Sequence, residues 1–292
     1  MKFTKMQGAG NDFVVVETND LQRDWSKTAV TMCDRHYGIG ADGLLLLLPS
    51  GVADFQMRMF NPDGSESDAC GNGLRCLVKH FVDGGLVPSG TQEIAVETVA
   101  GIRRAEIHKV AGETTKVQTD MGAPKFGESD IPVAIESRAG KVVDIKSMII
   151  YSVTVDDTEL PLNLVSMGNP HAVYFSQDPV ADFPLSQLGL KVERHRLFSR
   201  GVNFEVARVV NRDQIEARVW ERGAGETLAC GSGACAITVA ARLCGYIDDK
   251  VDIKLPGGVL EVEWDGAGVG EVFLSGPAET VFSGEWPDRS CY

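Results

Sequence analysis

The sequence lacks a long apolar run. Its longest aliphatic stretch, Leu44–Leu48, has five residues, whereas a helix that crosses a bilayer needs about 20. The first residues, Met1–Lys5, contain no apolar stretch of the kind found in secretory signals. We therefore expect no membrane partner, and we interpret Leu44–Leu48 as a buried strand.

Basic residues are in the minority. The chain has 28 Lys and Arg residues against 41 Asp and Glu residues, which gives a formal net charge of −13 at pH 7. Binding to a nucleic-acid backbone depends on a basic face, so we expect no nucleic-acid partner. Apolar residues make up 43% of the 292 residues, which is typical of a soluble globular protein with a substantial core.

Cysteine patterns that bind zinc or exchange disulfides are also missing from the sequence. The seven cysteines include no Cys-x-x-Cys pair, and their spacings do not match a zinc knuckle. An odd number of cysteines in a chain of this length is typical of a reducing compartment, so we expect a cytoplasmic protein. The segment Gly38–Gly43 fits the dinucleotide fingerprint, but a strand pattern follows it where a helix is required. We therefore predict neither a metal nor a bound nucleotide.

Two of the cysteines stand in matching motifs. Cys70-Gly71-Asn72-Gly73 and Cys230-Gly231-Ser232-Gly233 lie 160 positions apart (230 − 70), and each precedes a helical pattern. The backbone N–H groups and the dipole at a helix N-terminus favour a thiolate. A buried thiol in a tight glycine turn is the alternative for either motif alone. The matched pair favours a site that uses both thiols.

Other motifs recur at nearly the same spacing and in the same order. The further pairs are Gly10-Asn11 with Gly168-Asn169, Gly38-Ile39-Gly40 with Gly201-Val202-Asn203, and Gly101-Ile102 with Gly258-Val259. Ordered self-similarity of this kind predicts an internal duplication, and hence two similar domains. We place the first domain at residues 1–122, joined by the C-terminal segment 274–292, and the second at residues 123–273.

Apolar and polar residues alternate with the period of a strand over most of the chain, as in Asp54–Phe60 and Leu260–Trp264. Two stretches are strongly helical: Leu74–Val82 has apolar residues at helical spacing, and Ala234–Cys244 is apolar almost all round. A helix without a polar face must be surrounded. We predict an α+β fold in which each domain is a mostly antiparallel sheet that wraps a central helix.

Asparagines gather in the same glycine turns as the paired motifs. They are Asn11, Asn61, Asn72, Asn169 and Asn203. Turn chemistry explains any one of them, because Asn tolerates left-handed conformations. Five together favour a set of neutral hydrogen-bonding groups for a substrate with amino and carboxyl groups.

Three charged or titratable residues accompany these turns. Glu221 and Arg222 shortly precede Cys230 and suit an ammonium and a carboxylate respectively. An ordinary exposed ion pair is the alternative for them. His171 follows Gly168-Asn169-Pro170. It is either a site residue or a turn histidine with satisfied hydrogen bonds, and the motif favours the site.

Together these motifs resemble the diaminopimelate epimerase family, and they follow the family's order over essentially the whole chain. The matching segments are Gly8-Ala9-Gly10-Asn11-Asp12-Phe13, Asn61-Pro62-Asp63-Gly64-Ser65, Ala69-Cys70-Gly71-Asn72-Gly73-Leu74-Arg75-Cys76, Gly168-Asn169-Pro170-His171, Gly201-Val202-Asn203-Phe204, and Glu221-Arg222-Gly223 through Cys230-Gly231-Ser232-Gly233. One such motif alone is weak, whereas the combination is specific.

The resemblance implies an isomerase that converts LL-2,6-diaminopimelate to the meso form for lysine and peptidoglycan precursor biosynthesis, without pyridoxal phosphate or another cofactor. It implies an active site in the cleft between the two domains, with Cys70 and Cys230 as the acid/base pair. It also implies substrate binding by Asn11, Asn61, Gly71, Asn72, Asn169, Asn203, Glu221, Arg222, Gly231 and Ser232, and supporting roles for His171 and Glu221. The binding partner is then a small amino-acid substrate. The resemblance also allows a homodimer.

One position departs from the family pattern. Many members have Gln after the Asp of the glycine turn, whereas this chain has Gly43 after Asp42; we interpret Asp42 as structural. Other interpretations remain beside the epimerase. They are a related proline-type racemase or epimerase, a thiol-redox or metal-binding protein that uses Cys70 and Cys230, and a non-catalytic binding protein of the same fold.

Overall fold

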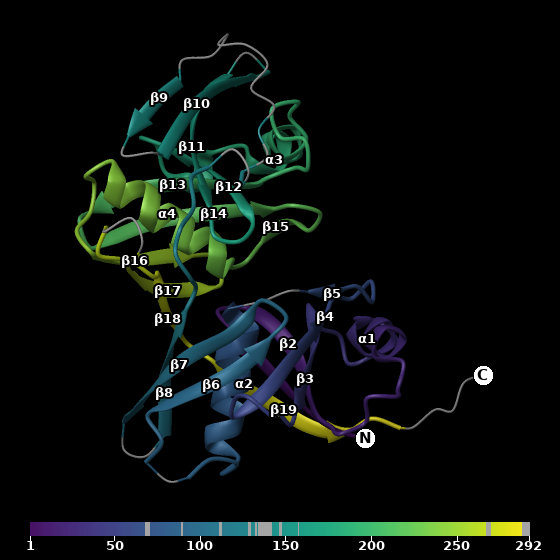
Figure 1. Cartoon of the computed structure of the whole chain (residues 1–292). Coiled ribbons are helices and arrows are strands. Elements are labelled where there is room, and N and C mark those ends of the chain that lie inside the picture. Colours follow the sequence, from purple (N-terminus) through teal and green to yellow (C-terminus); the bar gives the residue numbers. More distant parts are fainter. Residues whose placement is uncertain are drawn as a thin grey trace. The chain divides into compact units, whose positions relative to one another are not determined.

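The computed structural model divides the chain into two compact units. One comprises Met1–Asp120 and Ser275–Tyr292, and the other comprises Met121–Leu274. The residues that the structure describes are 1–67, 71–88, 90–110, 113–127, 130–131, 133, 142–145, 148–156, 158–266 and 270–287. Figure 1 shows the elements of each unit along the chain. No described helix has the length and apolar character needed to cross a membrane.

The first unit has two described helices, α1 (Trp25–Cys33) and α2 (Gly71–Asp83). Its strands are β1 (Lys2–Gly8), β2 (Asn11–Glu17), β3 (Gly43–Leu48), β4 (Phe55–Phe60), β5 (Glu66–Ser67), β6 (Glu93–Thr98), β7 (Gly101–Val110), β8 (Glu113–Asp120) and β19 (Glu279–Glu285). The chain returns from the second unit to the first within strand β18 (Phe273–Gly276).

The second unit has α3 (Leu185–Glu193), α4 (Gly231–Leu243) and a short 3-10 helix, η1 (Val180–Asp182), among its described residues. Its strands are β9 (Val142–Ile145), β10 (Met148–Val155), β11 (Thr158–Ser166), β12 (Pro170–Phe175), β13 (Asn203–Asn211), β14 (Gln214–Glu221), β15 (Gly225–Thr227), β16 (Lys250–Leu255) and β17 (Gly258–Glu263).

Both units repeat one strand-pairing scheme. In the first, β2 runs parallel to β3, the antiparallel strands β4 and β5 follow, and after α2 strand β6 pairs in parallel with β4 and antiparallel with β7. In the second, β12, β13, β14, β15, α4, β16 and β17 repeat the same steps. The duplicated, mostly antiparallel fold is thus confirmed. The parallel pairs arise where a helix carries the chain across the sheet.

Helices α1 and α3 were missed by the sequence prediction. Helix α1 lies in the crossover from β2 to the parallel strand β3, and α3 lies in the crossover from β12 to the parallel strand β13. For α1 the sequence holds a start signal, because the Asp24 side chain accepts a hydrogen bond from the Lys27 amide at 2.9 Å. Trp25, Ala29 and Met32 form its buried face at helical spacing. The surrounding strand periodicity outweighed these short signals.

Strand β3 is buried on both faces, which confirms the interpretation of the leucine run. Leu45 and Leu47 belong to the core around α2, whereas Leu44, Leu46 and Leu48 belong to the core around α1. A strand between two helical layers carries no polar face, so its sequence is continuously apolar. Helix α2 packs on β1, β2, β3, β4, β8 and β19, as expected of a central helix.

Strand β13 divides the second unit in the same way. Phe204 and Val206 pack in the core around α3. Asn203 and Glu205 alternate with them and therefore face the opposite side, where α4 packs against β11, β12 and β13. Every α4 residue except Ser232 and Arg242 is buried. The nearly all-apolar helix is therefore surrounded, as predicted.

Candidate active site

Cys230 caps the N-terminus of α4. Its backbone is extended (φ −124°, ψ 117°), and its Sγ accepts a hydrogen bond from the Gly233 amide at 3.4 Å. The Ser232 Oγ lies 3.5 Å from the same sulfur. Small residues follow the cysteine because a side chain at position 233 would meet the thiol: an added Cβ would lie 3.4 Å from Sγ. The predicted helix-terminal thiol is thus present in the second unit.

The surroundings of Cys230 favour the thiol over the thiolate. The residue is 5% exposed, and its burial raises the pKa well above the ordinary value. The Glu221 carboxylate raises this pKa further, while the hydrogen bonds from Ser232 and Gly233 lower it. The helix N-terminus alone predicted an easily formed thiolate. Burial beside acidic groups outweighs that effect, so Cys230 is protonated at neutral pH.

Asn169 and His171 lie next to the α4 N-terminus. Gly168 has φ +92°, a left-handed conformation that glycine adopts without strain, and this turn precedes β12. The Asn169 Nδ2 donates to Ser232 Oγ at 3.3 Å. The ring of His171, which is fully buried, contacts Asn169 Oδ1 through Nε2 at 2.9 Å. A continuous set of polar contacts therefore leads from β12 to Ser232.

Asn203 links two turns of the second unit. Its Nδ2 donates to the Pro170 carbonyl at 3.0 Å, and its Oδ1 accepts from the Arg222 amide at 2.9 Å. The side chain is 4% exposed and engages backbone groups on both sides. Its amide therefore fixes the start of β12 and the end of β14 in one arrangement.

Glu221 and Arg222 have different partners. Glu221 Oε1 accepts from Thr227 Oγ1 at 2.5 Å, across the β14–β15 pair. The exposed Arg222 side chain donates through Nη1 to the Arg200 carbonyl at 3.2 Å, and its stem lies against Gly201. The guanidinium retains donors for a carboxylate.

A cavity of about 300 Å³ lies beside Asn169 and Arg222. Its lining residues are Lys125, Asp130, Ser166, Gly168, Asn169, Pro170, Arg200 and Arg222. Three of them are cationic, and one is a carboxylate that contacts the Lys125 Nζ at 3.6 Å. Such a lining suits a small ligand that carries both an ammonium and a carboxylate.

In the first unit, helix α2 begins at Gly71, and Asn72 is a buried polar residue of its first turn. The Asn72 Nδ2 donates to Asn11 Oδ1 at 3.1 Å, and its Oδ1 accepts from the fully buried Arg75 at 2.7 Å. The Asn11 Nδ2 in turn donates to Asp42 Oδ2 at 2.9 Å. The structure therefore brings Asn11 and Asn72 together, as a pair held from both sides.

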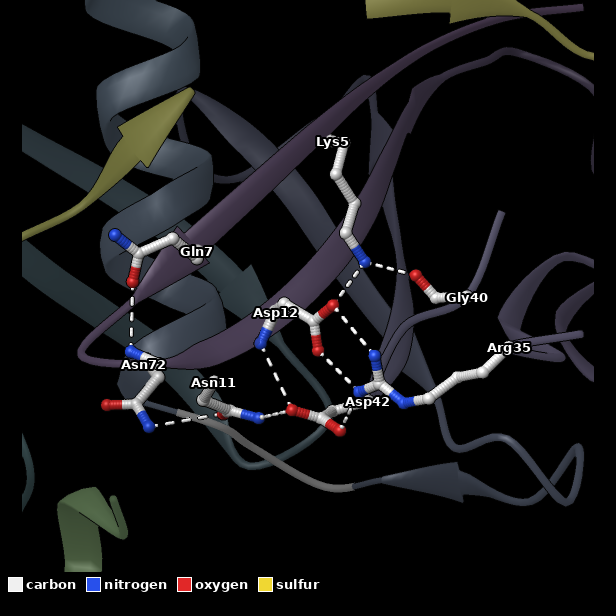
Figure 2. A network of polar contacts seen from close by, with 9 residues as sticks. Lys5, Gln7, Asn11, Asp12, Arg35, Gly40, Asp42 and Asn72 are labelled. Atoms are coloured by element: carbon white, nitrogen blue, oxygen red, sulfur yellow. Dashed lines mark hydrogen bonds and ion pairs between the residues drawn. The ribbon is translucent and has the colours of Figure 1, made fainter. Parts of the chain in front are cut away.

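An ionic network supports this pair (Figure 2). Asp42 also accepts from the Asp12 amide and pairs with Arg35 at 2.6 Å. Arg35 bridges to Asp12 at 2.7 Å, and the buried Lys5 contacts both Asp12 and the Gly40 carbonyl. Burial raises the Asp12 pKa, but the hydrogen bonds from Arg35 and Lys5 outweigh it and lower that pKa to about 2. This network gives Asp42 a structural role.

One described site residue, Asn61, has its side-chain contact elsewhere. Asn61 binds Ser65 Oγ at 3.0 Å within its own turn, as ordinary turn chemistry predicts. Cys70 lies outside the described residues. Gly231 opens α4 directly before Ser232.

The sequence reasoning missed four charged residues that hold these turns: Lys5, Asp12, Arg35 and Glu205. Glu205 had the clearest signal, since it is an acid within the apolar strand segment Phe204–Ala207. Within the described part of the chain, no group of three or more His, Cys, Asp or Glu residues is arranged to hold a metal ion.

Comparison with known proteins gives a consistent set of relatives. The diaminopimelate epimerase family model matches residues 3–127 and 163–281. The diaminopimelate epimerase of Pelotomaculum thermopropionicum is 45% identical over 296 residues, with 99% of this chain and 100% of that protein covered. That of Methanococcus maripaludis is 43% identical over 286 residues, with 98% and 99% covered.

Solved structures with the same fold are more distant in sequence. A probable proline racemase from Agrobacterium radiobacter has a TM-score of 0.70 at 15% identity, with 98% of this chain and 93% of that chain covered. A phenazine biosynthesis protein of the PhzF family from Bacillus anthracis has a TM-score of 0.71 at 17% identity, with 98% and 99% covered. At these identities the likeness concerns the two-domain fold alone.

Proposed function

Because the chain belongs to the diaminopimelate epimerase family, we propose that it interconverts LL- and meso-2,6-diaminopimelate by inverting one α-carbon. It is an isomerase of the type that works without pyridoxal phosphate. The observation that carries the proposed mechanism is the Cys230 thiol at the α4 N-terminus, in contact with Ser232 and the Gly233 amide.

Inversion without a cofactor requires two proton-transfer groups. One base removes the α-proton from one face, and an acid delivers a different proton to the opposite face. A single group would mostly return the proton to the face from which it came. Thiols suit both tasks, because their ordinary pKa of about 8.5 lies near neutral pH.

Cys230 is the proton donor of the resting protein. Its burial raises its pKa, so it holds a proton to give. The base is then Cys70, which takes the α-proton as a thiolate while the Cys230 thiol protonates the opposite face. After one turnover Cys70 carries the proton and Cys230 is the thiolate, which is the starting state for the reverse reaction. The two sulfurs therefore titrate as one coupled system.

The helix N-termini stabilise the charge that develops on the α-carboxylate. Helices α2 and α4 begin at Gly71 and Gly231, and the backbone amides of a helix's first turn have no acceptor within the helix itself. A carboxylate that gains charge in the transition state is stabilised most by donors that are already oriented. This is the role of Gly71, Asn72, Gly231 and Ser232.

The distal amino-acid group of the substrate binds at the cavity beside Asn169. Arg222 takes the distal carboxylate beside Asn169. Asn11, Asn61 and Asn203 are the further substrate-binding residues of the proposal. Glu221 takes an ammonium and lies close enough to Cys230 to raise its pKa. A proline-type substrate lacks the distal group and leaves the cationic side of the cavity without a partner.

The test measures two reactions of the full chain. Diaminopimelate interconversion is followed by chromatography, and α-proton exchange is followed by NMR in D₂O. Cys70→Ser and Cys230→Ser should each abolish interconversion while retaining exchange from one stereoisomer. Cys244→Ser, outside the site, is the matched control. Full interconversion by either site variant would refute the two-thiol mechanism, and turnover of proline by the wild type would favour the proline-type alternative.

We further propose that residues 1–122 with 274–292, and residues 123–273, act as domains whose cleft is the site of catalysis. The protein is cytoplasmic, as suits a biosynthetic enzyme with cysteine chemistry. Light scattering will distinguish a homodimer from a monomer.

A further inference from the structure

A fully buried acid and a fully buried imidazole meet behind Cys230. Glu205 Oε1 and His171 Nδ1 are 2.6 Å apart, and both side chains are 0% exposed. Glu205 Oε2 has no hydrogen-bond partner among the described residues. Burying a carboxyl group with one oxygen that accepts no hydrogen bond costs free energy. The proposed proton transfers do not use Glu205.

The parallel pairing of β12 with β13 places these two residues together. His171 is opposite Asn203, and Val173 is opposite Glu205. Side chains two positions apart on a strand share one face. His171 and Glu205 are thus diagonal neighbours on the face that packs against α4, where the Glu205 Oε1 would lie 3.0 Å from a Cβ placed at Gly233.

Hydrogen-bond accounting fixes the protons of the pair. The His171 Nε2 contacts Asn169 Oδ1, which only accepts, so Nε2 carries a proton. A second proton lies between Nδ1 and Glu205 Oε1. Without it both atoms would be acceptors, and two acceptors do not form a hydrogen bond. The two side chains together therefore carry two protons and no net charge. With the second proton on Glu205, its unpartnered Oε2 is a neutral carbonyl oxygen.

We propose that Glu205 is a positioning residue for the reaction: it holds His171 with Nε2 protonated and thereby directs a chain of donors toward the Cys230 sulfur. His171 Nε2 donates to Asn169 Oδ1, and Asn169 Nδ2 donates to Ser232 Oγ. Because Ser232 accepts from Asn169, its hydroxyl hydrogen is not used toward Asn169. That hydrogen therefore donates to Cys230 Sγ. The inference rests on the proposed role of Cys230.

The first unit supplies an internal comparison. There the register of β2 with β3 sets Phe13 opposite Gly43, as β12 with β13 sets His171 opposite Asn203. The positions that correspond to His171 and Glu205 are therefore Phe13 and Leu45. Both are apolar and lie in the core around α2. The first unit therefore folds with apolar residues at these two positions. The polar pair His171 and Glu205 is specific to the second unit, beside Cys230.

The groups around Glu205 shift its pKa in both directions, and the net shift is upward. Burial raises its pKa, and the nearby Glu221 on β14 raises it further. His171 and the Ala172 amide, both on β12, lower this pKa. Cys230, on the α4 side, is neutral as a thiol. The upward shift has the direction that the proton count drawn from the contacts requires.

The test uses variants of the full chain and the reactivity of one thiol. Glu205→Leu removes the donor and introduces the residue found at position 45. Glu205→Gln retains a donor, since its amide N–H is able to bind His171 Nδ1. Glu159→Leu, an exposed position on β11, is the matched control. Iodoacetamide labelling across pH, quantified on the peptide that contains Cys230, gives the thiol pKa.

We expect Glu205→Leu to raise the pKa of Cys230 by about one unit, which slows labelling below that pKa about tenfold. Glu205→Gln should restore wild-type labelling, and Glu159→Leu should not change it. An unchanged pKa in a folded Glu205→Leu protein would overturn the inference. So would a Glu205→Gln variant as impaired as Glu205→Leu, since the donor would then be irrelevant.

Two further measurements make the test independent of folding and of the overall function. In ¹⁵N-histidine NMR of the wild type, His171 should show a protonated Nε2 under the conditions of the labelling assay; an unprotonated Nε2 would refute the proposal even if Glu205→Leu fails to fold. The double variant His171→Phe/Glu205→Leu reproduces the packing of the first unit and should fold with the same raised thiol pKa. If labelling responds as expected but diaminopimelate is not turned over, the proposed function fails and the donor chain stands.

Discussion

Gly233→Ala is the most demanding test of the geometry around Cys230. The added methyl group would lie 3.0 Å from Glu205 Oε1 and 3.4 Å from Cys230 Sγ. The first distance is tighter than ordinary van der Waals contact, and the second is at the lower limit of such contact. Neither neighbour moves freely, because Glu205 is tied to His171 and Cys230 is tied to the helix N-terminus.

Two opposing effects set the change in stability. Alanine in a helix is favoured over glycine by about 1 kcal/mol. Overpacking a well-filled site costs about 1–3 kcal/mol. The expected net loss in the free energy of unfolding is therefore about 0–2 kcal/mol, so the variant should fold. The rate should suffer more, because a misplacement of about 1 Å costs about 100-fold in kcat. A shift of a few tenths of an ångström predicts a fall of about tenfold.

The assay is steady-state diaminopimelate interconversion together with urea unfolding. Gly51→Ala is the control, because an added Cβ there meets no atom within 4 Å. The control should keep both rate and stability. A Gly233→Ala protein with the wild-type kcat would show that the space between Cys230 and Glu205 tolerates a methyl group. The reasoning on the donor chain and on the thiol position would then be refuted together.

Three other predictions concern the first unit. The Asp12 pKa of about 2 lies below its ordinary 3.8, so its contribution to stability is present above about pH 4 and is lost as the pH falls toward 2; in urea unfolding, Asp12→Asn should destabilise the protein at pH 6 much more than at pH 2. Burial raises the Cys33 pKa to about 12, so mass spectrometry should find Cys33 unlabelled by iodoacetamide at pH 8 in the native protein, and rapid labelling would contradict its buried position. Leu77→Ala, in the fully buried face of α2, should cost about 2–5 kcal/mol of unfolding free energy, and a loss below 1 kcal/mol would show that α2 is not the centre of that core.

The sequence was sufficient to predict the duplication and the two central helices. Those features depend on long-range recurrence and on strong apolar periodicity, and both are visible without coordinates. Helices α1 and α3 are short, and they were obscured by the strand alternation around them. Their positions follow from the crossover between parallel strands, a tertiary constraint that local periodicity does not carry.

The candidate site was predictable in its motifs and not in its support. Asn169, Ser232 and Cys230 were found from paired glycine turns, and the structure joins them by direct contacts. Glu205 and Asp12 act through strand register and through partners more than 20 residues away in sequence, as the contacts with His171 and Arg35 show. The state of Cys230 also required the structure, since burial reversed the effect expected from the helix terminus.

The cysteine at the start of α4 has a consequence for protein engineering. Helix N-caps are normally oxygen-bearing side chains, and sulfur is a weak acceptor for the Gly233 amide. A serine at position 230 would tie down that helix end at least as well, so a redesign guided by thermostability alone would discard the sulfur early. An N-cap position that holds cysteine, where serine would cap the helix better, is thus a useful marker of a reactive residue when new sequences are ranked.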